Sequence, residues 1–184
     1  MNRRCTLGVA AAAALALMLP VSGQAQNAQQ RPQGAAPAAP AAPPKPMKEA
    51  IVGSWSLLID DAVKADGTHA PNFGPNPDGL VMFGSDGRFS LIVMRSGRAK
   101  FAANNRNGGT AEENKATVTG SNAFFGTYTV DEPTKTLTFN VEGATYPNLA
   151  GTVQKRTITS LTAGDEITWT NPATKGETAW KWVK

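Results

Sequence analysis

Residues 51–59 read Ile-Val-Gly-Ser-Trp-Ser-Leu-Leu-Ile, and this stretch carries the pattern that decides the fold. Every second position from Ile51 to Ile59 is apolar or glycine, whereas Ser54 and Ser56 occupy the opposite phase. A period of two is typical of a β-strand with one buried face, because successive side chains point to opposite sides. The stretch therefore predicts a first strand with Trp55 on its buried face.

The same alternation continues to the end of the chain. Asp86-Gly87 between two apolar runs is a strong hairpin signal. Further strands are expected at residues 80–83, 89–94, 124–130, 136–141, 152–161 and 166–170, and in a last run that carries Trp180 and Trp182. About eight strands in hairpin order predict an all-β fold, an eight-stranded antiparallel up-and-down barrel whose closure removes exposed edges. A β-sandwich is the alternative that the period alone leaves open.

One stretch departs from this pattern. Thr110-Ala-Glu-Glu113 has the residues of a capping box and predicts a short helix over residues 111–118. The polar, aperiodic residues 98–109 precede it. A long insert between two strands of a barrel is expected to form a lid or a rim.

The first 47 residues differ from the rest in composition. Residues 1–25 begin with Arg3 and Arg4, continue in an apolar run and end in small residues, which predicts a signal peptide cleaved after Ala25. The only cysteine, Cys5, precedes the apolar run, so neither lipidation nor a disulfide is expected. Residues 26–47 are rich in Gln, Ala and Pro and predict a disordered linker before a domain at 48–184. The expected location is periplasmic or secreted.

The charge of the chain belongs mainly to this front part. Of 18 Lys and Arg residues, four lie before residue 48, where there is no Asp or Glu. Residues 48–184 therefore carry 14 basic and 14 acidic side chains. A nucleic-acid surface needs a basic excess on the folded part, so no nucleic-acid partner is expected.

Several short motifs together resemble a known family. They are Ile51-Val-Gly-Ser-Trp55, Asp66-Gly-Thr68, Gly74-Pro-Asn-Pro-Asp-Gly79, Asp86-Gly-Arg-Phe-Ser90, residues 95–106, Glu112-Glu-Asn-Lys115, Phe125-Gly-Thr-Tyr128 and Gln154-Lys-Arg156. This ordered set resembles the bacterial lipocalin-like domain family, among the calycin-type barrels. The resemblance implies a barrel with a central pocket and no agreed catalytic residues. It also implies that Trp55 is structural and packs at the closed end under a basic residue, Lys181 or Lys184.

Candidate ligand-binding residues follow from strand phase and from the insert. Arg95 shares the phase of Leu91 and Val93, so it points inward near the mouth if that face lines the barrel. The candidate ligand-binding residues are Arg95, Arg98, Lys100, Arg106, Tyr128 and Trp169. The basic members suit the acid group of a ligand, and the aromatic members suit its apolar part. Two alternatives stay open: the arginines pin the helix at Glu112 and Glu113, or the aromatics only fill the core.

Other kinds of site find little support in the sequence. His69 is the only histidine, and a metal site needs three or four converging ligands, so no metal and no cofactor are expected. His69 is interpreted as a solvated loop residue. The adjacent carboxylates Asp60-Asp61, Glu112-Glu113 and Asp131-Glu132 look solvated and lack the pattern of an acid–base pair.

These observations favour an exported, monomeric protein that binds a small hydrophobic or amphipathic ligand, with anionic ligands included. No membrane span is expected once the signal peptide is removed. Two alternatives remain. One is an isomerase or hydrolase on the same barrel, which would need a buried titratable group in the pocket. The other is a non-catalytic interaction module of the cell envelope.

Overall fold

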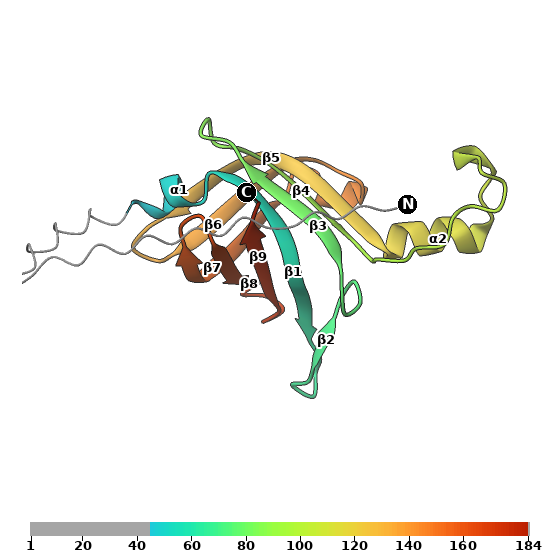
Figure 1. The fold of residues 1–184 in the computed structure, drawn as a ribbon, viewed down its shortest axis with the longest axis horizontal. Coiled ribbons are helices and arrows are strands. Elements are labelled where there is room, and N and C mark those ends of the chain that lie inside the picture. The colour runs from blue at the N-terminus through green and yellow to red at the C-terminus, as the bar shows by residue number, and fades with distance from the viewer. Residues whose placement is uncertain (1–44, 184) are drawn as a thin grey trace, which may run out of the picture. The chain divides into compact units, whose positions relative to one another are not determined.

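The computed structural model describes residues 45–183, which form a closed antiparallel β-barrel (Figure 1). Eight strands pair in sequence order, and the first also pairs with the last. They are β1 (Gly53–Val63), β3 (Asp78–Phe83), β4 (Arg88–Met94), β5 (Ser121–Asp131), β6 (Thr136–Ala144), β7 (Val153–Thr162), β8 (Glu166–Thr170) and β9 (Glu177–Trp182). The predicted eight-stranded up-and-down barrel is confirmed, and the sandwich alternative is wrong. The predicted signal peptide and the linker up to residue 44 lie outside the described residues.

A ninth strand, β2 (His69–Pro71), was not predicted. It pairs only with the last three residues of β1, beyond the point where β1 leaves the barrel. Figure 1 shows this β1–β2 hairpin extending past the end of the barrel wall. Because β2 is only three residues long and contains a proline, its sequence carries too little alternation to be read as a strand.

Alternate side chains along the strands point into the barrel and fill its interior. On β4, Phe89, Leu91 and Val93 are buried while their neighbours are more exposed. The interior is mostly aromatic and aliphatic, and its fully buried members include Trp55, Trp169, Trp180, Phe139, Leu137 and Ile167. The predicted inward phase of strands 89–94, 136–141 and 166–170 is therefore confirmed.

One end of the barrel is closed by the start of the domain. The single-turn helix α1 (Met47–Ala50) leads into Ile51, which is fully buried, and Met47 packs against the core. The indole Nε1 of Trp55 donates to the carbonyl of Ile51 at 2.8 Å. The residue at this end that contacts Trp55 edge-on is Trp182, with ring centroids 4.9 Å apart.

The prediction that Lys181 packs over Trp55 is wrong. Its Nζ instead lies 2.6 Å from the carboxylate of Asp165 on the outer surface. Lys184 lies outside the described residues. Trp182 packs on Trp55 where the basic residue was expected, and Gly53 makes room for it. The Trp182 ring covers the Gly53 backbone at the position where a Cβ would stand. A planar ring fits flat against a backbone that lacks a side chain.

The insert between β4 and β5 contains the turn η1 (Arg106–Gly108) and the helix α2 (Ala111–Thr119). The predicted capping box is present: the Glu113 N–H donates to Thr110 Oγ1, and the Thr110 N–H donates to Glu113 Oε2. No residue of α2 is buried, and Figure 1 shows α2 extending away from the barrel. The insert is therefore a projection beside the mouth and does not cover it.

The remaining elements complete the hairpins. The turn η2 (Pro147–Leu149) lies between β6 and β7, and Asp86 accepts the Arg88 N–H at 3.0 Å in the β3–β4 turn. Within residues 45–183, no helix combines the length and the apolar character needed to cross a membrane.

Candidate ligand-binding pocket

A cavity of about 410 Å³ lies inside the barrel at the end opposite α1. Its wall is formed by residues near the ends of β1, β4 and β8 and the starts of β5 and β9. Asn72, Thr119 and Thr174 line it and are exposed, so the cavity opens to solvent between the loops at this end. Its volume falls within the range of pockets that hold small molecules.

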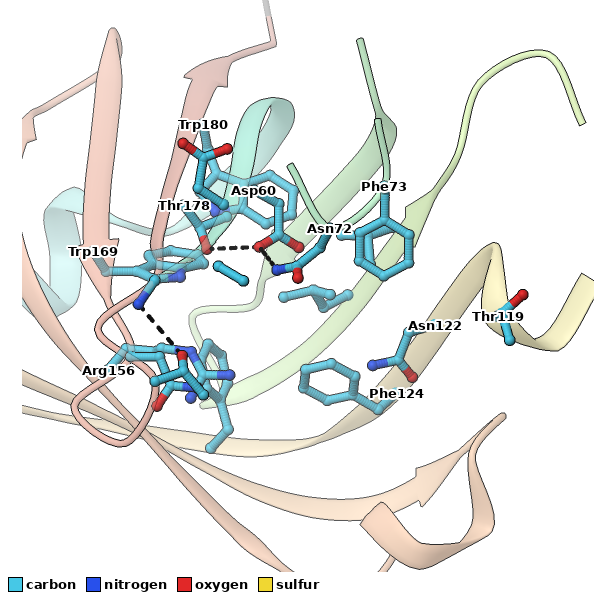
Figure 2. A pocket seen from close by; sticks show the side chains of 18 residues that line it. Asp60, Asn72, Phe73, Thr119, Asn122, Phe124, Arg156, Trp169, Thr178 and Trp180 are labelled. Atoms are coloured by element: carbon cyan, nitrogen blue, oxygen red, sulfur yellow. Dashed lines mark hydrogen bonds between the residues drawn. The ribbon is translucent and has the colours of Figure 1, made fainter. Parts of the chain in front are cut away.

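Aromatic side chains form the inner part of the cavity wall. Phe124, Phe139, Trp169 and Trp180 all line it and are at most 6% exposed. Trp169 and Trp180 are in contact, with ring centroids 5.4 Å apart. Phe73 joins them from the loop after β2, near the mouth (Figure 2). Such a wall suits the apolar part of a ligand.

Asp60 brings a carboxyl group to this wall. A β-bulge at Leu58 shifts the register of β1 against β9, so that Asp60 lies opposite Thr178. Its Oδ1 accepts from the Asn72 side chain at 3.1 Å and from Thr178 Oγ1 at 3.5 Å (Figure 2). Burial raises the pKa of Asp60 above its ordinary value of 3.8, because desolvation outweighs these hydrogen bonds and the attraction of Arg156. The expectation that Asp60 is solvated is wrong.

Arg156 supplies a positive charge to the same cavity. It lies opposite Leu137 of β6, which is fully buried, and therefore faces the interior. Burial lowers the pKa of its guanidinium, an effect that the nearby charge of Asp60 only partly offsets. Within residues 45–183, no carboxylate oxygen lies within 4.0 Å of it. Its one hydrogen bond is from Nη1 to the carbonyl of Lys155 at 2.7 Å.

Two further residues of this wall each have a polar atom that is buried behind the cavity surface and has no hydrogen-bond partner among the described residues. These atoms are Asn122 Oδ1, an acceptor, and Trp180 Nε1, a donor. Leaving such a group unpaired costs about 1–3 kcal/mol. In the view of Figure 2, Asp60, Arg156 and Asn122 stand on three different sides of the cavity.

Of the predicted ligand-binding residues, some line the cavity and others lie outside it. Trp169 lines the cavity. Arg95 follows the end of β4 and is exposed, with Nη2 3.5 Å from the carbonyl of Asn72 at the mouth. Arg98, Lys100 and Arg106 are exposed on the projecting insert and do not line the cavity.

The interior position expected for Arg95 is wrong, because β4 ends at Met94 and the strand phase is not carried further. The alternative, in which the basic residues pin the helix at Glu112 and Glu113, is not observed either. Within residues 45–183, no ion pair joins these basic residues to Glu112 or Glu113. Glu113 instead accepts from the Ala102 N–H at 2.8 Å, and these backbone hydrogen bonds lower its pKa.

Tyr128 belongs to the other end of the barrel. It is buried against Phe83, and its hydroxyl donates to the carbonyl of Gly84 at 2.8 Å. Burial raises the pKa of this hydroxyl. Tyr128 does not line the cavity, so it contributes to the core of the closed end.

His69 is exposed on β2, and its Nδ1 lies 3.7 Å from a carboxylate oxygen of Asp61. It is therefore a surface residue, as expected, although it lies in a short strand and not in a loop.

Sequence reasoning missed Asp60, Arg156 and Asn122. Arg156 is two residues before the buried Ile158 on β7, and Asn122 is two residues before the buried Phe124 on β5. Strand phase alone could therefore have placed both inside. Asp60 carried no such signal, because without the bulge at Leu58 it would point outward.

One of the comparisons with known proteins agrees with this geometry. A search of curated proteins found no match. The profile of the lipocalin-like domain matches residues 52–183, which include every strand of the barrel and the whole cavity wall. The closed antiparallel barrel described above is consistent with a lipocalin-like fold. The chain therefore belongs to the lipocalin-like domain family.

Proposed function

We propose that this protein is an exported carrier that binds a small amphipathic acid inside its barrel. The acid group lies against Arg156, and the apolar part lies against Phe124, Phe139 and Trp169. The observation that carries this proposal is the guanidinium of Arg156, which lines a cavity and has no carboxylate partner among the described residues. Membership of a ligand-binding fold family supports it.

The electrostatics favour an anion over a cation. A desolvated guanidinium is costly unless an anionic or strong hydrogen-bonding group accompanies it. Arg156 has one hydrogen bond to a backbone carbonyl, so most of its five N–H donors are open to a ligand. Carboxylates, sulfonates and phosphates match the planar fork of guanidinium with two parallel hydrogen bonds.

The protonation of Asp60 also affects the binding of an anion. Its raised pKa means that a proton neutralises the carboxyl more readily than in water. A bound anion would raise this pKa further, because it adds a second negative charge to the cavity. Binding of the acid is therefore accompanied by proton uptake at Asp60. The affinity for the acid increases as the pH falls towards the pKa that Asp60 has in the ligand-free protein.

Export rests on the composition of residues 1–47. A charged start, an apolar run and small residues before Ala25 support cleavage by a signal peptidase. N-terminal sequencing of the protein from its own host tests this, with Gln26 as the expected first residue. An intact Met1 would contradict export by this route. We further propose that the carrier is a monomer, with no nucleic-acid partner.

Two fluorescent probes with nearly the same ring system test the binding site. Anilinonaphthalene sulfonate carries an acid group, and phenylnaphthylamine does not. The wild-type protein is expected to bind both. Arg156→Gln is expected to weaken binding of the sulfonate by about tenfold or more while leaving the neutral probe unaffected, because only the charged hydrogen bonds are lost.

Lys155→Gln is the matched control, because it removes the same charge one residue away on the exposed side of β7. Equal loss in both variants, or no loss in Arg156→Gln, would contradict an acid site at Arg156. Native mass spectrometry of protein purified gently from its own host complements the probes. A defined excess mass that leaves on activation identifies the natural compound.

A second candidate is catalysis, which the carboxyl of Asp60 specifically favours. A titratable group with a raised pKa in a cavity is what general acid–base chemistry requires. The test is hydrolysis of nitrophenyl esters of aromatic acids by the wild type and by Asp60→Asn. Turnover that disappears in Asp60→Asn while the probes still bind would support an enzyme. Equal rates in both would leave the carrier as the function.

A further inference from the structure

We propose that the insert between β4 and β5 docks on the anionic surface of a lipid membrane, where the barrel takes up or releases its ligand. The insert comprises residues 95–120, from the end of β4 to the start of β5. The proposal goes beyond the proposed function, and only the choice of a membrane as the partner rests on that function.

The positive charge of the folded part is concentrated in this insert. Residues 95–120 contain five basic and two acidic side chains, whereas the rest of residues 48–184 contains nine basic and twelve acidic ones. The five basic residues are Arg95, Arg98, Lys100, Arg106 and Lys115. A domain with no net charge thus carries a surplus of three positive charges on one projection. Such a projection is attracted to an anionic surface and orients the barrel against it.

These positive charges are available to a partner. All five basic residues are exposed, and within residues 45–183 none of them has a carboxylate oxygen within 4.0 Å. Of the two acids, Glu113 accepts from the backbone N–H groups of Ala102 and Thr110. Its carboxylate therefore serves the fold of the insert and leaves the surplus of positive charge in place.

The insert adjoins the mouth of the cavity at both of its ends. At the first end, Arg95 Nη2 lies 3.5 Å from the carbonyl of Asn72, which lines the mouth. At the other end, Thr119 is the last residue of α2 and lines the cavity itself. Between these ends α2 buries no residue and extends away from the barrel (Figure 1). Contact of the insert with a membrane would therefore bring the mouth close to the lipid.

Three arguments favour a membrane over an acidic protein as the partner. An amphipathic acid of the proposed kind partitions into bilayers, so a carrier that docks there meets its ligand. Val118, in the last turn of α2, is 65% exposed and adds an apolar contact among the charges. The β1–β2 hairpin, the other projection from the barrel, carries Asp61 and Asp66 against one lysine, Lys64. An extended anionic surface would repel this hairpin and meet the insert.

Co-sedimentation with lipid vesicles tests the proposal, with the protein in the form that its own host produces. The wild type is expected to bind vesicles of mixed phosphatidylglycerol and phosphatidylcholine at least about tenfold more tightly than vesicles of phosphatidylcholine alone. Added salt should release it, because salt screens charges at a surface. This comparison needs no variant.

An insert variant and a control variant each lose three positive charges. The substitutions in the insert variant are Arg98→Gln, Lys100→Gln and Arg106→Gln. Those in the control variant, at exposed positions outside the insert, are Lys48→Gln, Lys64→Gln and Lys155→Gln. The insert variant is expected to bind the mixed vesicles at least about tenfold more weakly than the wild type. The control variant should stay within about threefold, because charges more than a Debye length from the lipid are screened.

Three results would overturn the proposal. The first is equal binding of the wild type to both kinds of vesicle, or binding to neither. The second is an equal loss in the two variants, which would make overall charge and not the insert responsible. The third is retention of the wild type, and not of the insert variant, on immobilised polyglutamate without binding to vesicles, which would assign the insert to an acidic protein.

The proposed function is judged by a separate readout. Both variants should bind anilinonaphthalene sulfonate in solution as the wild type does, because none of the six substituted residues lines the cavity. If the wild type binds vesicles but no acid, the carrier is wrong and the docking surface stands. If it binds the acid but not the vesicles, the carrier stands and the docking surface is wrong.

Discussion

At the scale of single residues, Gly53 shows how one backbone position fixes the closed end. Its φ of +137° disfavours any side chain, and the ring of Trp182 occupies the space of a Cβ. Gly53→Ala is expected to lower the free energy of unfolding by at least about 2 kcal/mol, from backbone strain and overpacking together. Urea denaturation measures this.

The control for Gly53→Ala is Gly67→Ala. Gly67 also has a positive φ, of +82°, but nothing lies within 4 Å of a Cβ placed there. Only the cost of holding an alanine at a positive φ remains, about 1 kcal/mol. Equal losses in the two variants would show that contact with Trp182 contributes nothing.

Asp60 gives a prediction of pH dependence. Because its pKa in the folded protein is raised above 3.8, the folded state holds the proton more tightly than the unfolded chain. The wild type therefore loses stability relative to Asp60→Asn as the pH rises from 3.8 through the folded pKa. Below this window the two proteins are expected to be equally stable, and above it the variant is expected to be the more stable.

Unfolding free energies between acid and neutral pH test this, with Asp66→Asn as the control of opposite sign. Hydrogen bonds from Thr68 lower the pKa of Asp66, so that its carboxylate stabilises the fold above its ordinary pKa and the effect disappears on acidification. A stability difference for Asp60→Asn that does not vary with pH would contradict a raised pKa.

At the scale of elements, α2 is held by its cap and not by packing. Thr110→Ala removes the acceptor of the Glu113 N–H and is expected to cost the helix about 1 kcal/mol. Hydrogen exchange within α2 should become faster, whereas the melting temperature of the barrel should not change, because α2 buries no residue. Thr117→Ala removes an exposed threonine within the helix and should slow the exchange.

Most elements could be predicted from the sequence, and the exceptions have local causes. Residues 51–59 indicated β1 correctly up to Leu57, but the bulge at Leu58 inverts the phase and turns Ile59 outward and Asp60 inward. A bulge depends on pairing with β9, more than 100 residues later, so local alternation cannot reveal it. The interior positions of Arg156 and Asn122 were readable from phase, because each precedes a buried residue by two.

At the scale of the whole molecule, the barrel separates stability from binding. Tyr128 and Gly84 lie at the closed end, and Asp60, Arg156 and Asn122 lie in the pocket. Tyr128→Phe is expected to lower the free energy of unfolding by about 1 kcal/mol, through loss of one hydrogen bond, with no change in affinity for anilinonaphthalene sulfonate. A parallel loss of affinity would show that the two ends are coupled.

The pairing of β1 with β9 also governs when the chain can fold. β1 can pair with β9 only after residues 177–182 have left the ribosome, so until then the nascent chain carries an open sheet edge at β1. Contacts this distant in sequence form slowly, so closure of the barrel between β1 and β9 comes late in folding. For the export that we propose, this delay would be an advantage, because an unclosed barrel remains able to thread through a narrow channel.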